Sequence, residues 1–307
     1  MHPAWSVILL TTLLGAGQGL FLALVAVDAL GGAPTPFLVS GSIISILLLA
    51  AGLLASFFHL GRPARAWRSA AKWRTSWLSR ETIVLPAFLA AVFAYGAVHQ
   101  FAPGERALAL EVGAVGVALC LALFVCTGMI YACLKFLQEW HTALTPLNYL
   151  LLGTASGFTL AAALAALDTP RYAGQLAISA LVIGALAYLV RLAALARNAR
   201  LRPKSTLATA IGVKHPKIVQ KAQGFMGGSF NTREFFHGRT RETVRAVRWA
   251  FLALVFPVPA LLLAWGGESA AALIAAFVLQ YAGLLAERWY FFAEANHPQN
   301  LYYQAIA

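Results

Sequence analysis

The stretch FFHLGRPARAWRSAAKWRTSWLSRE, residues 57–81, connects two long apolar segments and carries six Lys and Arg side chains, Arg80 included. Gly61 and Pro63 are residue types that end helices, and Ser76 and Ser79 favour the start of the next one. A basic connection between two apolar helices is typical of a cytoplasmic loop in a membrane protein. The stretch therefore predicts two membrane spans joined on the cytoplasmic side.

The composition of the whole chain agrees with a polytopic membrane protein. Of 307 residues, 60% are hydrophobic and only 11% are charged. At about 20 residues or more for each membrane helix, the length holds about eight spans and little soluble domain. The first apolar segment has no basic region before it and is too long for a cleaved signal, so we interpret it as a retained span.

Eight apolar segments are long enough to cross a bilayer as helices, which keep their backbone hydrogen bonds internal. They are predicted at about residues 5–28, 37–60, 82–101, 107–134, 146–167, 172–196, 247–265 and 270–291. The predicted fold class is an all-α integral membrane protein, a bundle of eight transmembrane helices. We expect a single domain over residues 1–307 with an extended cytoplasmic loop at about 197–246.

The distribution of basic residues predicts the orientation in the membrane. If the eight segments alternate, all but two of the 23 Lys and Arg residues, Arg106 and Arg171, fall on the side of both termini. Lys and Arg are enriched in cytoplasmic loops. Both termini are therefore predicted to be cytoplasmic, in a multi-pass protein of a bacterial inner membrane. The net charge of +12 follows from this topology, and no nucleic-acid partner is expected.

Several kinds of chemistry are not expected from the chain alone. It shows no catalytic triad, nucleotide-binding loop, HExxH motif or cluster of metal ligands. Cys120, Cys126 and Cys133 are too few for an iron–sulfur cluster or a cysteine zinc site, and we interpret them as small buried hydrophobic residues. The chain is expected to be non-catalytic on its own and to hold no metal.

Ionisable residues at membrane depth are the remaining candidates, because they are costly there and usually functional. His59 is predicted in the last turn of one span and Glu81 at the start of the next, with Arg65 and Trp77 between them. A pocket with an apolar interior and a polar mouth suits a quinone, whose oxygens exchange protons. In the alternative interpretation His59 caps its helix and Glu81 pairs with a nearby arginine.

Two further pairs of residues are candidates for the site. Tyr131 and Lys135 stand at positions i and i+4 and are expected to share a helix face at the cytoplasmic end, as a second wall of the quinone pocket. Snorkelling of Lys135 toward the headgroups is the simpler alternative. His59 and His141 lie on the same predicted side and are a less favoured pair of axial ligands for a haem b.

Four segments resemble the DmsC family, the membrane anchor subunits of molybdopterin oxidoreductase complexes. They are HPAWSVILLTTLLGAGQGL (2–20), HLGRPARAW (59–67), SWLSRE (76–81) and ERWYFFAEANHPQNLYY (287–303). The resemblance implies eight spans, a molybdopterin catalytic subunit and an iron–sulfur subunit as partners that hold those cofactors, and electron exchange with ubiquinone or menaquinone. It also implies that His59, Arg65 and Glu81 belong to the quinone site, beside an Arg80 that departs from the family pattern.

The basic side also predicts where the partners dock and which complex they form. Because the loop with His59 and Glu81 is predicted to be cytoplasmic, the catalytic subunits are expected there too. A cytoplasmic catalytic subunit favours a sulfite dehydrogenase that passes electrons to quinone. The alternative is the anchor of a dimethyl sulfoxide reductase-type complex that oxidises menaquinol. A purely structural anchor or a transporter is the alternative from another class, and a transporter predicts broken helices with paired ionisable residues at mid-membrane.

Overall fold

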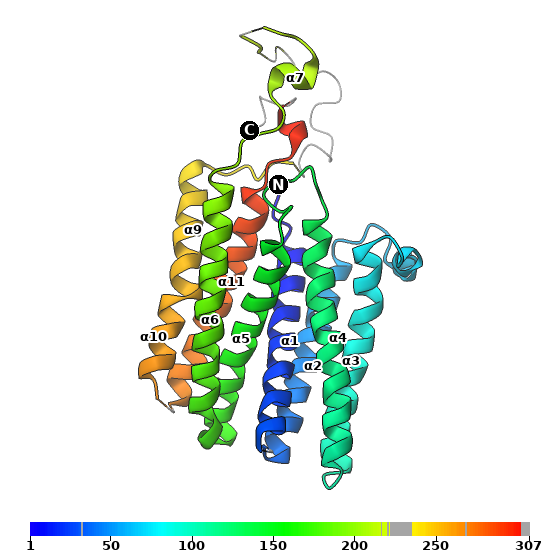
Figure 1. Ribbon diagram of the computed structural model, residues 1–307, viewed down its shortest axis with the longest axis vertical. Coiled ribbons are helices and arrows are strands. Elements are labelled where there is room, and N and C mark those ends of the chain that lie inside the picture. Colours follow the sequence, from blue (N-terminus) through cyan, green and yellow to red (C-terminus); the bar gives the residue numbers. More distant parts are fainter. Residues whose placement is uncertain (32, 216, 220, 222–234, 268, 302–307) are drawn as a thin grey trace.

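The computed structural model describes residues 1–31, 33–215, 217–219, 221, 235–267 and 269–301. Within these ranges the chain forms helices and no strands, and the long helices run side by side as a bundle (Figure 1). Eight helical segments of the described chain are long and apolar enough to cross a membrane. The predicted all-α fold with eight spans is confirmed.

The eight candidate spans include one that is built from two helices. They are α1 (Trp5–Gly31), α2 (Thr35–Phe57), α3 (Trp77–Phe101), α4 (Arg106–Ala132), α5 (Leu144–Asp168), α6 (Pro170–Asn198), α9 (Arg241–Val255) with α10 (Pro257–Trp265), and α11 (Ala270–Glu294). Shorter helices are η1 (Pro63–Lys72), α7 (Leu207–Ile211) and η2 (Pro298–Leu301). Because the number of spans is even, α1 begins and α11 ends at the same end of the bundle (Figure 1).

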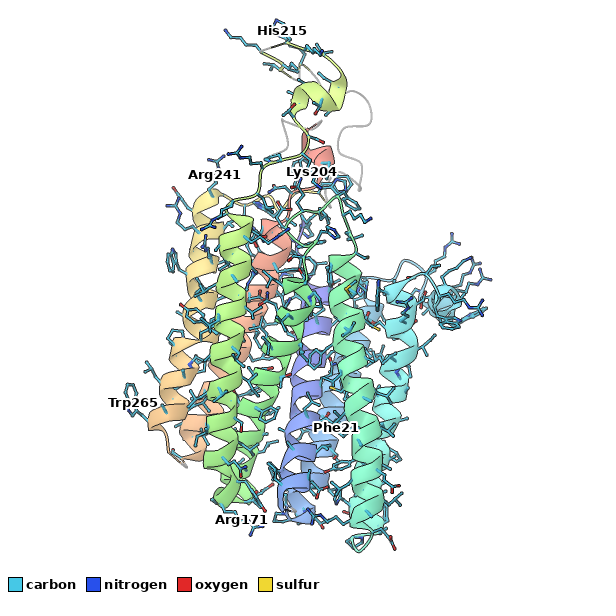
Figure 2. The ribbon with its side chains drawn as sticks, viewed as in Figure 1. Phe21, Arg171, Lys204, His215, Arg241 and Trp265 are labelled. Carbon is cyan, nitrogen blue, oxygen red and sulfur yellow. The ribbon has the colours of Figure 1, made fainter. Side chains whose placement is uncertain are left out.

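We call this end the basic end; its described residues are 1–4, 58–76, 133–143, 199–215, 217–219, 221 and 235–240. Figure 2 places Lys204, His215 and Arg241 there, whereas Arg171 lies at the opposite end. The loop predicted at 197–246 is shorter than expected, since α6 continues to Asn198 and α9 begins at Arg241. Residues 216, 220 and 222–234 of that loop lie outside the described residues.

The centre of the bundle is a close crossing of α1 and α5. Gly15 and Gly19 on α1 face Gly153 and Gly157 on α5, each pair four residues apart. A Cβ atom on Gly157 would overlap the Gly19 carbonyl carbon. Small residues at this spacing let two membrane helices pack backbone against backbone. The crossing fixes α5 against α1, with α3 and α4 on one side and α6, α9 and α10 on the other (Figure 1).

The seventh span is interrupted at Phe256, between α9 and α10. Pro257 lacks an N–H group and disfavours helical geometry in the residue before it, and Phe256 has φ −114° and ψ −79°. An apolar groove of about 440 Å³ lies beside the break, between α6 and α10. Its described lining includes Gln280 but no Asp, Glu, Lys or Arg.

Three helix ends near the opening stretch differ from their predicted positions. The span predicted to end at residue 60 ends at Phe57, and the one predicted to begin at residue 82 begins at Trp77, because the Ser76 hydroxyl accepts a hydrogen bond from the Ser79 N–H at 3.3 Å. The span predicted to reach residue 134 ends at Ala132. As a result, Glu81 lies one turn inside a helix and His59 lies beyond one.

Candidate functional site

Glu81 is buried between α3 and α4 near the basic end. Its side chain is on the fourth residue after Trp77, and the residue is only 7% exposed. The Thr127 hydroxyl on α4 donates a hydrogen bond of 2.5 Å to Glu81 Oε1. Among the described residues no cation forms an ion pair with this carboxylate. A buried carboxyl group with one neutral partner is a group that can take up and release a proton beside a reaction.

The other residues of the predicted pocket lie around Glu81 and do not bond to it. His59 lies in the turn that follows α2, where burial of part of the ring lowers the pKa of its imidazole. Arg65 is exposed on η1, which extends sideways from the bundle (Figure 1). Trp77 begins α3, and the Arg80 guanidinium lies 4.2 Å from the centre of its ring. Within the described chain no hydrogen bond or ion pair joins His59, Arg65 or Trp77 to Glu81, so a joint site remains a prediction.

Tyr131 and Lys135 do not share a helix face, and that expectation was wrong. Because α4 ends at Ala132, Lys135 belongs to the following turn. It lines a cavity of about 590 Å³ at the basic end, together with Glu139. Tyr131 stays in α4, one turn after Thr127, and packs against four aromatic rings. These are Trp140, Tyr149, Phe291 and Phe292, with ring centres 5.3–5.6 Å away.

The histidines considered as haem ligands are both exposed. His141 follows α4 in the connection to α5, and its Nδ1 atom lies 2.6 Å from the Ala132 carbonyl oxygen. His59 is exposed beyond the end of α2. Axial ligation by two histidines needs both rings inside the bundle at one depth, and the candidate spans contain a single histidine, His99. The positions of His59 and His141 therefore do not favour a haem between them.

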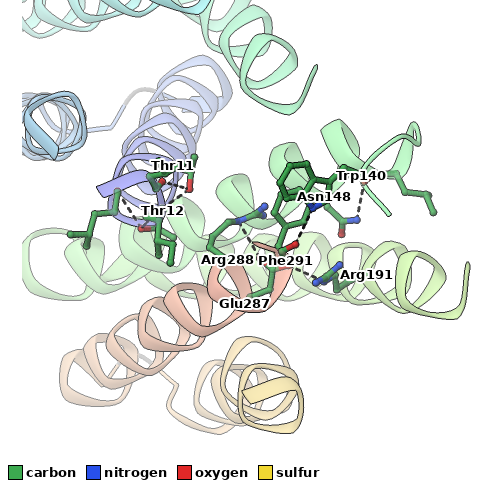
Figure 3. Close-up of polar contacts among 12 residues, drawn as sticks. Thr11, Thr12, Trp140, Asn148, Arg191, Glu287, Arg288 and Phe291 are labelled. Atoms are coloured by element: carbon green, nitrogen blue, oxygen red, sulfur yellow. Dashed lines mark hydrogen bonds and ion pairs between the residues drawn. The ribbon is translucent and has the colours of Figure 1, made fainter. Parts of the chain in front are cut away.

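A buried ion-pair network that the sequence did not indicate connects α6 with α11 (Figure 3). Arg191 Nε on α6 lies 2.9 Å from Glu287 Oε1, and Arg288 Nε lies 3.1 Å from Glu287 Oε2. All three side chains are at most 5% exposed. The Arg288 guanidinium also lies 3.8 Å from the centre of the Tyr149 ring on α5. Arg191 and Arg288, assigned above to the basic side, are thus buried inside helices.

Hydrogen bonds join the connection between α4 and α5 to α11 and to the start of α5, next to this network. The Trp140 indole N–H donates to the Phe291 carbonyl oxygen on α11 at 2.9 Å, and Thr145 donates to the Trp140 carbonyl oxygen at 2.7 Å. Trp140 also stacks on the Phe291 ring with centres 5.1 Å apart. These contacts fix α11 relative to α4 and α5, and hold Glu287 and Arg288 toward the interior.

The buried polar groups lie at one depth. We call the set the polar layer; it consists of Glu81, Thr127, Tyr149, Arg191, Glu287 and Arg288. Each member is four to seven residues from the end of its helix at the basic end. At 1.5 Å of rise per residue, this is a depth of roughly 6–10 Å. The layer crosses the bundle from the α3–α4 side to the α6–α11 side, so the Glu81 carboxyl is part of a wider polar interior.

A second buried cluster joins α1, α3 and α4 at the opposite end. Asp28 Oδ2 accepts a hydrogen bond from the Tyr95 hydroxyl at 2.9 Å and lies 3.0 Å from His99 Nε2. Arg106 donates to the Asp28 backbone carbonyl at 2.7 Å. The residues come from three helix ends that meet there, so we interpret the cluster as a clamp that holds those ends together.

A bundle of eight candidate spans defines a polytopic membrane protein. Its buried ionisable side chains form a layer near the basic end. The family model of the DMSO reductase anchor subunit (DmsC) matches residues 1–294. The chain is also 56% identical, over the full length of both chains, to a sulfite dehydrogenase subunit of Allochromatium vinosum. It belongs to the DmsC family and is a membrane anchor subunit of an oxidoreductase complex, which confirms the resemblance seen in its motifs.

Proposed function

We propose that this anchor subunit exchanges electrons between an iron–sulfur partner subunit and the quinone pool, in a complex that oxidises sulfite. The 56% identical relative is a subunit of a sulfite dehydrogenase, and this supports the choice of substrate. A dimethyl sulfoxide reductase-type complex that oxidises menaquinol is the alternative that the family description supports. In both cases the molybdopterin and iron–sulfur cofactors belong to partner subunits.

The buried Glu81 carboxyl carries the proposal for a quinone site. A quinone accepts electrons, and its reduction to quinol also consumes protons. The neighbouring helix ends expose the apolar side chains Phe57, Phe58 and Leu78 at the edge of the bundle, where an apolar ring and tail can enter from the bilayer. Glu81 lies one turn below this edge, so its carboxyl is placed to give or take a proton there.

The roles of the surrounding residues follow from their positions. The Thr127 hydroxyl donates a hydrogen bond to Glu81 Oε1 and thereby fixes the orientation of the carboxyl group. Partial burial lowers the pKa of the His59 imidazole, which favours its neutral form, and that form can accept a proton. Arg65 and Trp77 lie between the two in sequence, where the guanidinium attracts a partial negative charge on a quinone oxygen and the indole covers the ring.

The partner subunits are proposed to dock at the basic end, and the basic end is proposed to face the bacterial cytoplasm. The concentration of Lys and Arg residues at that end supports this orientation, because such residues are enriched in cytoplasmic loops. The end also carries the cavity of about 590 Å³ lined by Lys135 and Glu139. A partner at this end would bring its cluster to the same side of the membrane as Glu81.

The variant Glu81→Gln tests the quinone site in the assembled complex in lipid nanodiscs. Quinone-linked turnover is expected to fall by roughly 10²-fold or more, because positioned acids and bases contribute about 10²–10⁴. Turnover with a soluble acceptor that takes electrons directly from the partner subunits should stay normal. Glu111→Gln, at an exposed carboxylate of α4, is the matched control. Normal quinone-linked turnover in Glu81→Gln would contradict the quinone site and leave only the role of a structural anchor.

A further inference from the structure

Two small cavities lie inside the polar layer, on the two sides of Arg288. The first has a volume of about 20 Å³ and is lined by Thr127, Tyr149, Ser156 and Arg288 among others. The second has a volume of about 10 Å³ and is lined by Asn148, Arg191, Glu287, Arg288 and Glu139 among others. A water molecule needs about 10–15 Å³ of such space and two or more polar partners. Both cavities are therefore of a size and polarity for single waters.

Buried polar atoms at both cavities have no direct hydrogen-bond partner among the described residues. At the second cavity they are Asn148 Oδ1 and Arg191 Nη2. At the first cavity, the Tyr149 hydroxyl lies beside Arg288 and Tyr131 without forming a well-aligned hydrogen bond to either. Tyr149 and Asn148 are 5% exposed and Arg191 is 2% exposed. Buried polar groups in folded proteins are nearly always paired with protein or with ordered water. A single water in each cavity would be within reach of these atoms and would satisfy them.

Polar side chains and the two cavities follow one another in a series from Glu81 to the basic end. Thr127 bonds to Glu81 and also lines the first cavity. Arg288 lines both cavities and is ion-paired with Glu287, a carboxylate that it shares with Arg191. Glu139 lines the second cavity and also the open cavity of about 590 Å³ at the basic end.

We propose that this series of side chains and cavities is a water-bridged proton route between Glu81 and the solvent at the basic end. The proposal rests on the proposed function, in which the partner subunit supplies two electrons for each quinone reduced to quinol. The two protons required then come from the basic-end solvent, through Glu139 and water in the second cavity, past the Arg288 guanidinium, which stays charged and takes no proton itself. They continue to the Tyr149 hydroxyl, water in the first cavity and the Thr127 hydroxyl, and so to Glu81. Glu81 passes each one on and is reprotonated from the route.

The route is tested with Thr127→Val and Tyr149→Phe, which remove one hydroxyl each and keep the Glu81 carboxyl. Quinone-linked turnover and proton uptake, the latter followed with a pH-sensitive dye, are measured in the assembled complex. Both rates are expected to fall together by roughly tenfold or more, on the scale of a lost proton-transfer step. Thr127→Ser, which keeps the hydroxyl, should restore them. Thr159→Val and Tyr188→Phe, whose hydroxyls line neither cavity, should match the native complex.

The outcomes separate the route from the proposed function. If Glu81→Gln is slow while Thr127→Val and Tyr149→Phe stay within about twofold of native, Glu81 exchanges protons directly through the 58–76 connection, and the route is wrong. If Thr127→Ser fails to recover the rate, or the controls are equally slow, the effect is one of packing and the route is again wrong. If Glu81→Gln itself is normal, the proposed function fails, and the route fails with it.

Discussion

At the scale of single residues, Glu287 is the side chain on which the polar layer depends most. It lies between the Arg191 and Arg288 guanidinium groups and is 1% exposed. A buried ion pair is a weak source of stability as a whole, because the desolvation of its charges offsets their attraction. Removal of one partner is different, since it leaves a buried charge without compensation. The network is therefore most sensitive to the loss of its single shared carboxylate.

Glu287→Gln is expected to lower the stability of the subunit by about 3–5 kcal/mol, the cost of leaving buried cations unpaired. The midpoint of thermal unfolding in detergent measures the change. Glu111→Gln, at an exposed position of α4, should leave the stability within about 0.5 kcal/mol of native. Replacement of Arg191, Glu287 and Arg288 together by leucine should recover most of the loss. A midpoint that Glu287→Gln does not move would contradict the buried network.

The sequence could predict Glu81 but not Glu287, for a physical reason. Glu81 follows a recognisable N-cap serine and a basic stretch, so local signals place it at a span. Glu287 stands beside Arg288 and an aromatic run that is also typical of an ordinary membrane-interface end. Its inward orientation is set by packing of α11 on α5 and α6, and such contacts between distant segments leave no periodic pattern in one sequence.

At the scale of helices, hydropathy predicted which elements exist, and local chemistry decided where they end. All eight predicted spans are found, because a bilayer demands long apolar helices. The predicted end of α4 was two residues too late, and this was enough to separate Lys135 from Tyr131. The break at Pro257 was also missed, although proline disfavours a continuous helix. Apolar composition continues across both positions, so hydropathy alone does not reveal them.

The α1–α5 crossing makes a prediction at the same scale. Gly157→Ala places a Cβ atom onto the Gly19 carbonyl carbon, so the two helices must move apart and the layers around them must shift. We expect a loss of stability of about 3 kcal/mol or more, at the upper end of overpacking effects, with reduced yield of folded subunit by size-exclusion chromatography. Gly184→Ala, which meets no atom within 4 Å on α6, should be neutral or stabilising by up to about 1 kcal/mol. Equal yields of the two variants would argue against the close crossing.

At the scale of the whole molecule, the two ends of the bundle differ in charge and in function. The opposite end holds the Asp28 clamp and few basic residues, whereas the basic end holds the polar layer, the open cavity and the chain segments proposed to meet partners. The charge asymmetry was visible in the sequence because topology sorts Lys and Arg. The same count treated Arg191 and Arg288 as surface residues, because a count does not distinguish a loop cation from a buried one.

Cys133 provides a native reporter for the orientation. It is exposed just after α4 at the basic end, whereas Cys120 and Cys126 are buried; the expectation that all three are buried was therefore wrong for Cys133. If the basic end is cytoplasmic, a membrane-impermeant maleimide should label Cys133 in inverted membrane vesicles and not in spheroplasts. Labelling should increase after partner subunits are washed off, because they are proposed to cover this end.

The combined variant Cys133→Ser with Gly104→Cys moves the reporter to the opposite end. Gly104 lies in the exposed connection between α3 and α4, with no atom within 4 Å of an added Cβ, so the new thiol is tolerated and accessible. It should be labelled in spheroplasts and protected in inverted vesicles. The reverse pattern for both reporters would place the basic end outside the cytoplasm. Glu81 would then draw its protons from the opposite compartment, and the catalytic subunits would have to be exported.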